Sequence, residues 1–387
     1  MKINALSGQM PAGHSLYGNL TKMNITSIVP LLLKWFAQNA RNLPWRHQQT
    51  PYRVLVSEIM LQQTRVEAVK GYFNRFMQEV PDIRVLAALP EERLLKLWEG
   101  LGYYSRAKNL QKAARIAVEK YQGELPNSYA ELLKLPGIGS YTAGAVASIA
   151  FHIPVPAVDG NVLRVWMRLT ADSADISDAA VKKQVEQALL PLMPEKESGN
   201  FNQALMELGA VVCVPNAAPK CEKCPVSAIC MAHQAGRELQ FPVKKPKPPR
   251  RIEERTLLLM EQSGRIAIRR RPPKGLLASL WELPGFEGTL SQEQAVAAVR
   301  SFGLEPVRLT PLSPAKHIFT HIEWHMTGWR VQLEPAVGSP ELVWADSQTL
   351  HEKYPLPSAF RSYLRQFLQD KIMDRGSLDL NAKNAEK

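Results

Sequence analysis

The sequence predicts two unlike domains, an all-α domain followed by an α+β domain. The length allows this, because 387 residues are enough for two or three domains whose apolar cores need no disulfide bonds. From position 25 to about 240, apolar residues recur three or four positions apart, which is the helical period. After a segment with four prolines and five basic residues at 241–251, strand-like patterns begin.

We place the domain boundaries where these patterns change. Residues 26–240 are expected to form the all-α domain, 241–251 a stiff basic linker and 252–370 the α+β domain. Residues 1–25 lack the apolar core of a secretory signal, so we expect a flexible N-terminal arm on a cytoplasmic protein. Residues 371–387 are poor in apolar side chains and are expected to be disordered. No apolar stretch approaches the roughly 20 residues that span a bilayer, so we expect no membrane association.

Apolar spacing identifies individual helices and strands. Three groups of residues are typical of amphipathic helices: Ile28, Leu31, Leu32 and Trp35; Val85, Leu86, Leu89 and Leu94; and Tyr129, Leu132 and Leu133. In the second domain, Thr256–Met260 and Ile266–Arg270 flank a Gln-Ser-Gly turn and predict a hairpin. Ile322–Leu333 alternates in part as a strand does, and helices are expected over Gln292–Phe302 and 360–368.

Composition and charge narrow the class of partner. With 45% hydrophobic and 22% charged residues, the chain is typical of globular proteins rather than of disordered, coiled-coil or collagen-like chains. Lysine and arginine number 48 against 36 acidic residues, which gives a net charge of +12. This excess favours a polyanionic partner, although a charge that serves only solubility explains it equally well.

Residues 135–145, with the sequence LPGIGSYTAGA, predict a tight turn between two helices. Gly137 and Gly139 permit the turn and leave backbone N–H groups at the start of the next helix, where they can bind a phosphate. The simpler interpretation is an ordinary helix-turn-helix corner. The small residues that follow Tyr141 favour a hairpin that clamps the DNA backbone without reading the sequence.

Two carboxylates stand out by their surroundings. Glu58 is the sole acid in an apolar helical run, and burial there would raise its pKa into the range that suits a general acid. The alternative is a glutamate that reaches solvent or pairs with an arginine such as Arg46. Asp159 directly precedes a helical pattern, so it is expected to cap that helix, a role that is compatible with catalysis.

All four cysteines of the chain fall in one short segment, which predicts a metal or cluster site rather than dispersed disulfides. They are Cys213, Cys221, Cys224 and Cys230. A zinc site is one interpretation, but zinc motifs usually contain two Cys-x2-Cys or Cys/His pairs, and only one such pair is present.

Taken in order, these motifs resemble those of the MutY-type adenine DNA glycosylases. That family belongs to the helix-hairpin-helix superfamily, which also contains the endonuclease III type. The resemblance runs across the whole helical domain and continues more weakly into the second domain. The segments that carry it are LPWR at 43–46, SEIMLQQT at 57–64, GLGYYSR at 100–106, the hairpin at 135–145, VDGNVLR at 158–164 and the four cysteines.

The resemblance implies that the protein acts on double-stranded DNA and removes adenine mispaired with 8-oxoguanine or guanine, and we expect it to be a monomer. Glu58 would protonate the adenine at N7, and Asp159 would stabilise the oxocarbenium ion of the sugar. Asn161 and Tyr141 would assist at the same site. The endonuclease III relatives carry, at the position of Tyr141, a lysine that forms a Schiff base; a phenol cannot, so we expect a monofunctional glycosylase without lyase activity.

The resemblance also implies DNA contacts and a cofactor. The expected DNA-contacting residues of the helical domain are Arg46, Gln62, Gln63, Tyr103, Gly137 and Gly139, with Gln63 and Tyr103 matching the family's wedge and flipping residues. The four cysteines would hold a 4Fe-4S cluster. Their first spacing is one residue longer than is usual in the family. Lys220 and Lys223 would face phosphate, unless they are simply a solvated basic rim.

In the second domain, GLLASLWELPG at 275–285 resembles the Nudix-like C-terminal domain of these enzymes. The positions expected to be acidic in a working Nudix hydrolase hold Ala297, Arg300 and Ser301, so we expect a lesion-recognition module instead. Residues 317–321 resemble the loop that senses 8-oxoguanine, with Phe319 inserted and Thr320 and His321 beside the lesion; an alternating strand is the simpler interpretation.

Three rival functions remain at this point. An endonuclease III-like glycosylase/lyase is disfavoured by Tyr141 and by the second domain. A non-catalytic DNA-binding iron-sulfur protein would not need both Glu58 and Asp159. A nucleotide pyrophosphatase is disfavoured by the missing Nudix glutamates.

Overall fold

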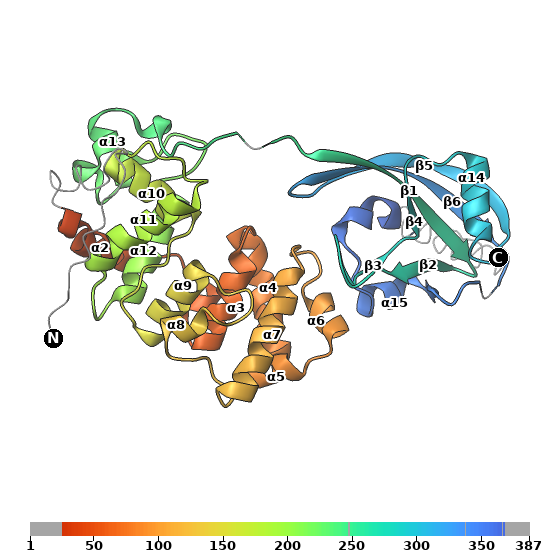
Figure 1. Cartoon of the computed structure of the whole chain (residues 1–387), viewed down its shortest axis with the longest axis horizontal. Helices are drawn as coiled ribbons and strands as arrows, with labels where there is room; N and C mark the ends of the chain where they lie inside the picture. Colours follow the sequence, from red (N-terminus) through yellow and green to blue (C-terminus); the bar gives the residue numbers. More distant parts are fainter. Residues whose placement is uncertain (1–24, 247, 337, 366, 368–387) are drawn as a thin grey trace, which may run out of the picture. The chain divides into compact units, whose positions relative to one another are not determined.

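The structure is a computed structural model that describes residues 25–246, 248–336, 338–365 and 367. The expected N-terminal arm, apart from Ile25, and the expected C-terminal tail lie outside these residues. The chain separates into two compact units (Figure 1). The first contains the described residues up to Ala87 and Asn109–Pro246; the second contains Ala88–Lys108 and the described residues after position 247. Each unit is described by itself.

The first unit is helical, as the apolar spacing predicts. Its helices, two of which cross the boundary between the units, are α2 (Ile28–Asn39), α3 (Pro51–Leu61), α4 (Val66–Glu79), α5 (Ile83–Ala88), α7 (Ser105–Lys120), α8 (Tyr129–Leu132), α9 (Ser140–Phe151), α10 (Gly160–Thr170), α11 (Ala179–Leu189), α12 (Ser198–Val211) and α13 (Met231–Gln234). Helices α2, α10 and α12 enclose a core around Ile28, Trp166 and Phe201, which are fully buried. Each such side chain contributes about 1.5–3 kcal/mol by its burial.

Two helical patterns end sooner than their spacing suggests. Val85 and Leu86 lie on α5, Leu94 lies on α6 (Glu91–Leu97), and Leu89 falls between the two helices, because Pro90 lacks an N–H group and restricts the residue before it. The pattern at Tyr129 produces only α8, a single turn that stops just before the 135–145 hairpin.

The second unit is a mixed sheet with helices packed against it. Its strands are β1 (Arg251–Gln262), β2 (Arg265–Arg270), β3 (Trp281–Glu282), β4 (Gly285–Glu287), β5 (Pro306–Ile318), β6 (Ile322–Leu333) and β7 (Leu342–Ala345). Its helices include α6, α14 (Gln292–Arg300) and α15 (Ser347–Glu352). The main path is β3-β2-β1-β6-β5, with β4 beside β1 and β7 beside β2. Only the β1–β6 pair is parallel among the described pairs.

Alternation along β1 builds a core on each face of this sheet. Leu257 and Leu259 join a cluster that contains Trp324 and Phe360. The intervening residues Leu258 and Met260 join a second cluster together with Val299 of α14 and its neighbours. The expected α+β class is therefore confirmed for this unit.

Local predictions for the second unit are also confirmed. The β1–β2 hairpin turns at Ser263 and Gly264, both with positive φ (44° and 72°), as a type I′ turn requires. Strand β6 has the predicted bounds, and α14 lies within the predicted helix. His317 and Ile318 end β5, whereas residues 319–321 form the connection between β5 and β6; the alternating-strand interpretation of 317–321 is therefore confirmed for the first two residues and wrong for the other three.

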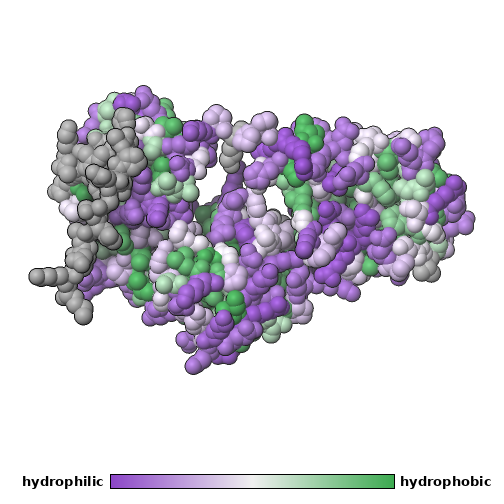
Figure 2. All heavy atoms as spheres, in the orientation of Figure 1, coloured by the Kyte–Doolittle hydropathy of each residue, from purple (hydrophilic) through white to green (hydrophobic). Residues whose placement is uncertain are grey.

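The surface shown in Figure 2 is mostly hydrophilic, and apolar side chains form small scattered groups on it. Within the described ranges, no helix has both the length and the apolar character needed to pass through a bilayer.

Candidate active site

The first unit contains a cavity of about 590 Å³ between α3, α9, α10 and α12. Such a volume accommodates a small-molecule-sized group. The cavity gathers residues that lie far apart in the sequence. The predicted site residues that line it are Arg46, Glu58, Gln62, Gln63, Gly139, Tyr141, Asp159 and Asn161. Gly137, Tyr103 and residues 319–321 do not line it.

Glu58 is held inside this cavity by α3. The helix begins with Pro51 in its first turn and with the Thr50 side chain accepting a hydrogen bond from the Arg53 N–H. Glu58 is only 6% exposed, and burial raises its pKa to about 7. The Tyr141 hydroxyl donates to Glu58 Oε2. Burial also raises the pKa of Tyr141 far above its usual value, so the phenol stays protonated.

Asp159 has the predicted place at the start of α10 and caps the helix. Its Oδ1 accepts from the Val162 N–H at 2.8 Å, and its Oδ2 accepts from the Asn161 side-chain amide at 2.7 Å. Burial raises the pKa of Asp159 as well, but these hydrogen bonds and the charge of Arg164 oppose the rise. Asp159 thus has more groups that favour its ionised form than Glu58 has.

Asn161 is oriented by a buried arginine. Arg164 Nη2 donates to Asn161 Oδ1 at 2.9 Å and to the Gly209 carbonyl at 2.7 Å, while its Nε donates to the Cys213 carbonyl at 2.8 Å. The side-chain amide of Asn161 is therefore fixed with its nitrogen toward Asp159.

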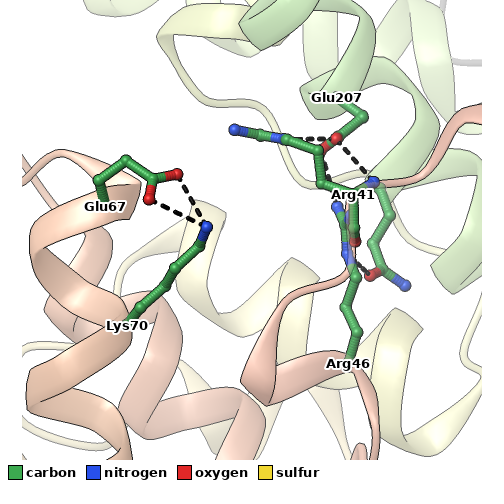
Figure 3. Close-up of polar contacts among 6 residues, drawn as sticks. Arg41, Arg46, Glu67, Lys70 and Glu207 are labelled. Atoms are coloured by element: carbon green, nitrogen blue, oxygen red, sulfur yellow. Dashed lines mark hydrogen bonds and ion pairs between the residues drawn. The ribbon is translucent and has the colours of Figure 1, made fainter.

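A third buried carboxylate lines the cavity and was not expected from the sequence. Glu207 on α12 accepts from Arg41 Nε at 2.6 Å and from Arg46 Nη2 at 2.9 Å (Figure 3). Burial opposes its ionisation, but the two arginines outweigh burial and lower the pKa of Glu207. Arg46 thus pairs with Glu207 and not with Glu58, which was the alternative considered from the sequence. Like Glu58, Glu207 is a lone acid in an apolar helical run, and that signal could have identified it.

The 135–145 hairpin forms at the N-terminus of α9. Gly137 has a φ of 76°, and a Cβ there would lie 2.7 Å from Asn109 Cβ. Gly139 precedes the helix as its N-cap, and the first N–H groups of α9 lack intrahelical acceptors. The turn thus places these N–H groups at the start of α9, and their binding of a phosphate stays a prediction.

The expected wedge residues lie on two loops. Gln63, which follows the C-cap Gln62 of α3, has a φ of 57°, and Gln62 donates to Thr142 Oγ1 at 3.3 Å. Tyr103 belongs to the second unit and is 45% exposed. Its hydroxyl lies 2.9 Å from Thr320 Oγ1, so two predicted lesion-contacting residues meet. The Phe319 ring packs edge-on against Trp324, with the ring centroids 4.9 Å apart.

The four cysteines follow α12 in a series of short turns and form no disulfide. Burial raises the pKa of Cys221, Cys224 and Cys230, that of Cys224 to about 12, and the neighbouring cysteine sulfurs raise these three pKa values further. Arg168 Nη1 donates to Cys213 Sγ at 3.3 Å. Thiolates in this position need a bound cation, and the donor set fits a thiolate-ligated cluster. Cys221, His233 and Glu238 also place ligand atoms within 4.8 Å of one another, which keeps a mixed zinc site as the alternative.

Comparison with known proteins identifies the family. Residues 56–191 match the HhH-GPD superfamily of base excision DNA repair proteins, and residues 255–366 match the NUDIX domain. The adenine DNA glycosylase of Mus musculus is 35% identical over 405 residues, which cover 88% of this chain and 78% of the mouse protein. The chain belongs to the adenine DNA glycosylase family. The Homo sapiens adenine DNA glycosylase is 36% identical, over 77% of this chain and 66% of its own.

Among solved structures, this glycosylase is similar to a thermostable thymine-DNA glycosylase, with 30% identity and a TM-score of 0.49, over 54% of this chain and 96% of that one. The family assignment confirms the resemblance seen in the sequence motifs. It also confirms the expected succession of a helix-hairpin-helix domain and a Nudix-like domain in this adenine DNA glycosylase.

Proposed function

We propose that this adenine DNA glycosylase removes adenine opposite 8-oxoguanine or guanine in duplex DNA, with Glu58 as general acid and Asp159 as the stabiliser of the oxocarbenium ion. The observation that carries the proposal is one cavity with two carboxylates in unlike environments. Such a pair divides acid and charge-stabilising work, as in glycoside hydrolysis.

Adenine is a poor leaving group until it is protonated. A pKa of about 7 keeps a large share of Glu58 protonated at neutral pH, and the Tyr141 hydroxyl occupies only Oε2. Oε1 is thus left to carry the proton that goes to N7 of the base. The base must first leave the helical stack, which costs a few kcal/mol.

As the glycosidic bond breaks, positive charge develops on the sugar. Asp159 is held by Val162 and Asn161, so its carboxylate needs no reorganisation when that charge appears. Water then completes the hydrolysis. Tyr141 stands where a lyase would need an amine, so the reaction ends at the abasic site, and the enzyme is monofunctional.

The DNA contacts are proposed at three places. The hairpin with Gly137 and Gly139 clamps a phosphate through backbone N–H groups. Gln62, Gln63 and Arg46 border the cavity that receives the base, and Tyr103 enters the duplex. On the second unit, the β5–β6 connection with Phe319, Thr320 and His321 reads the base opposite the adenine. Ala297, Arg300 and Ser301 on and next to α14 offer no carboxylate for a nucleotide hydrolase.

The four cysteines are proposed to hold a 4Fe-4S cluster. When bound, the cluster supplies a compact iron–thiolate core that ties the segment from Cys213 to Cys230 to the apolar core beside it. Arg168 donates a charge-assisted hydrogen bond to the Cys213 sulfur and offsets the negative charge there. The excision itself is assigned to Glu58 and Asp159.

A glycosylase assay on three duplexes tests the proposal. They carry one A opposite 8-oxoguanine, opposite G or opposite T, and alkali reveals the abasic sites. We expect release from the first two and little from the A·T control, with an uncut strand before alkali. Failure to release adenine opposite 8-oxoguanine would contradict the substrate, and a borohydride-trapped crosslink would contradict the monofunctional assignment.

A further inference from the structure

The loop between α6 and α7 presents an exposed aromatic ring on a constrained backbone. Gly100, Gly102 and Tyr103 have φ values of 96°, 71° and 47°. Glycine adopts such angles readily, but a tyrosine in the left-handed region costs free energy and persists only where its surroundings enforce it. Tyr103 is nevertheless 45% exposed, so burial in a core does not explain the conformation.

Arg106 binds the backbone on both sides of this strained residue. Its Nη2 donates to the carbonyls of Leu101 and Gly102, each at 3.1 Å, immediately before Tyr103. Its own backbone N–H donates to the Tyr103 carbonyl at 2.9 Å. Trp98 Nε1 also donates to the Gly102 carbonyl, at 3.3 Å.

The same guanidinium group lies against the ring. Arg106 Cζ is 5.5 Å from the ring centroid of Tyr103 and 5.6 Å from that of Trp98, within the range of cation–π contact. Arg106 is only 9% exposed, and although burial lowers its pKa to about 10, it remains charged at neutral pH. A lysine could not supply the flat surface and the two-carbonyl contact together.

We infer that Arg106 is a positioning residue that holds Tyr103 ready to enter the duplex, and that it does not itself bind phosphate. The inference rests on the proposed role of Tyr103 in contacting DNA. It adds that Arg106, together with the Thr320 contact, orients this exposed tyrosine. Because Nη2 is engaged with Leu101 and Gly102 and the side chain is buried, the arginine acts through Tyr103.

A double-mutant cycle tests the coupling in the full-length protein. Single-turnover adenine release from A opposite 8-oxoguanine is measured for wild type, R106Q, Y103A and R106Q/Y103A. We expect R106Q to lose most of what Y103A loses, roughly ten-fold, and the double variant to equal Y103A. R106K should recover part of the loss. Arg115, on the same helix, donates to the Ala87 carbonyl instead, so R115Q is the matched control and should retain the wild-type rate.

If the R106Q substitution causes the same loss in the Y103A background as in wild type, the two losses are additive. That result would overturn the inference and would mean that Arg106 has a general structural role. A second readout is independent of activity. With 3-fluorotyrosine at position 103, the ¹⁹F signal of the DNA-free protein should broaden or shift in R106Q and stay unchanged in R115Q. An unchanged signal in R106Q would also overturn the inference, whereas a wild type without adenine release would contradict only the proposed function.

Discussion

Glu58 and Asp159 differ in the number of groups that favour their charged forms. Glu58 is buried and accepts one side-chain hydrogen bond, from Tyr141, whereas Asp159 accepts from a backbone N–H and an amide and lies near Arg164. In the proposed reaction, environment rather than residue type thus distinguishes the acid from the carboxylate. At the residue scale, the pKa of Glu58 also ties the stability of the protein to pH.

The Glu58→Gln variant should reveal this linkage. The pKa of Glu58 is raised in the folded state to about 7, so its neutral form contributes stability that is complete below the unfolded pKa near 4.5. That contribution is lost as pH rises through about 7. Relative to E58Q, the free energy of unfolding of wild type should fall by at most about 3 kcal/mol between pH 4.5 and 8. Denaturant unfolding at both pH values measures it, and a pH-independent difference would contradict the raised pKa.

At the element scale, the sequence predicts features that follow from local chemistry. The Ser-Gly turn of the β1–β2 hairpin, the alternation in β6 and the Asp159 cap each depend on a few neighbouring residues. The pairing of Glu207 with Arg41 and Arg46 depends on α12 packing beside a segment over 160 positions earlier, which no local pattern specifies. The break in the helical pattern at Pro90 could have been predicted from the sequence, since proline disfavours a continuous helix.

The helical hairpin at 135–145 leads to a testable prediction at the element scale. Gly137→Ala should weaken binding to an undamaged duplex about ten-fold, because φ is positive and the new Cβ would meet Asn109, a strain of about 1–3 kcal/mol. Gly71→Ala on α4 is the matched control, since its Cβ would meet only the end of the Arg75 side chain at 3.4 Å and alanine favours a helix. Fluorescence anisotropy measures both; equal affinities would show that the turn does not clamp DNA.

The segment that contains the four cysteines leads to another prediction at the element scale. Protein purified anaerobically should contain iron and sulfide, and Cys230→Ser should lose the iron and lower the melting temperature, because that sulfur packs beside the core of α10 and α12. Exposed Lys223, which lies between Cys221 and Cys224, provides the control K223Q, which should keep its iron. Stoichiometric zinc without iron would favour the mixed site of Cys221, His233 and Glu238.

At the scale of the whole molecule, contacts group Ala88–Lys108 with the sheet of the second unit. Lys96 Nζ donates to the carbonyls of Leu350 and Tyr354, and the Leu356 N–H donates to Glu99. Deleting the second domain would therefore deprive α6 of its partners. Point substitutions in the β5–β6 connection are the cleaner way to test where the opposite base is read.

Phe319→Ala combined with Thr320→Ala should narrow the preference for A opposite 8-oxoguanine over A opposite G. Loss of one discriminating contact costs about 1–3 kcal/mol, or roughly 5- to 150-fold. Rates on both duplexes give the ratio, and Val307→Ala, an exposed residue at the far end of β5, is the control. An unchanged ratio would mean that this connection does not read the lesion.

Glu58 supplies the proton for adenine departure in the proposed reaction, and single-turnover excision by E58Q tests this role most directly. Binding of a duplex with A opposite 8-oxoguanine is measured beside the excision rate. Glu67→Gln, which breaks a surface pair with Lys70 (Figure 3) and does not alter the lining of the cavity, is the control. We predict that E58Q binds normally and releases adenine at least about 100-fold more slowly, while E67Q matches wild type; near-normal release by E58Q would contradict the assignment of Glu58 as the acid.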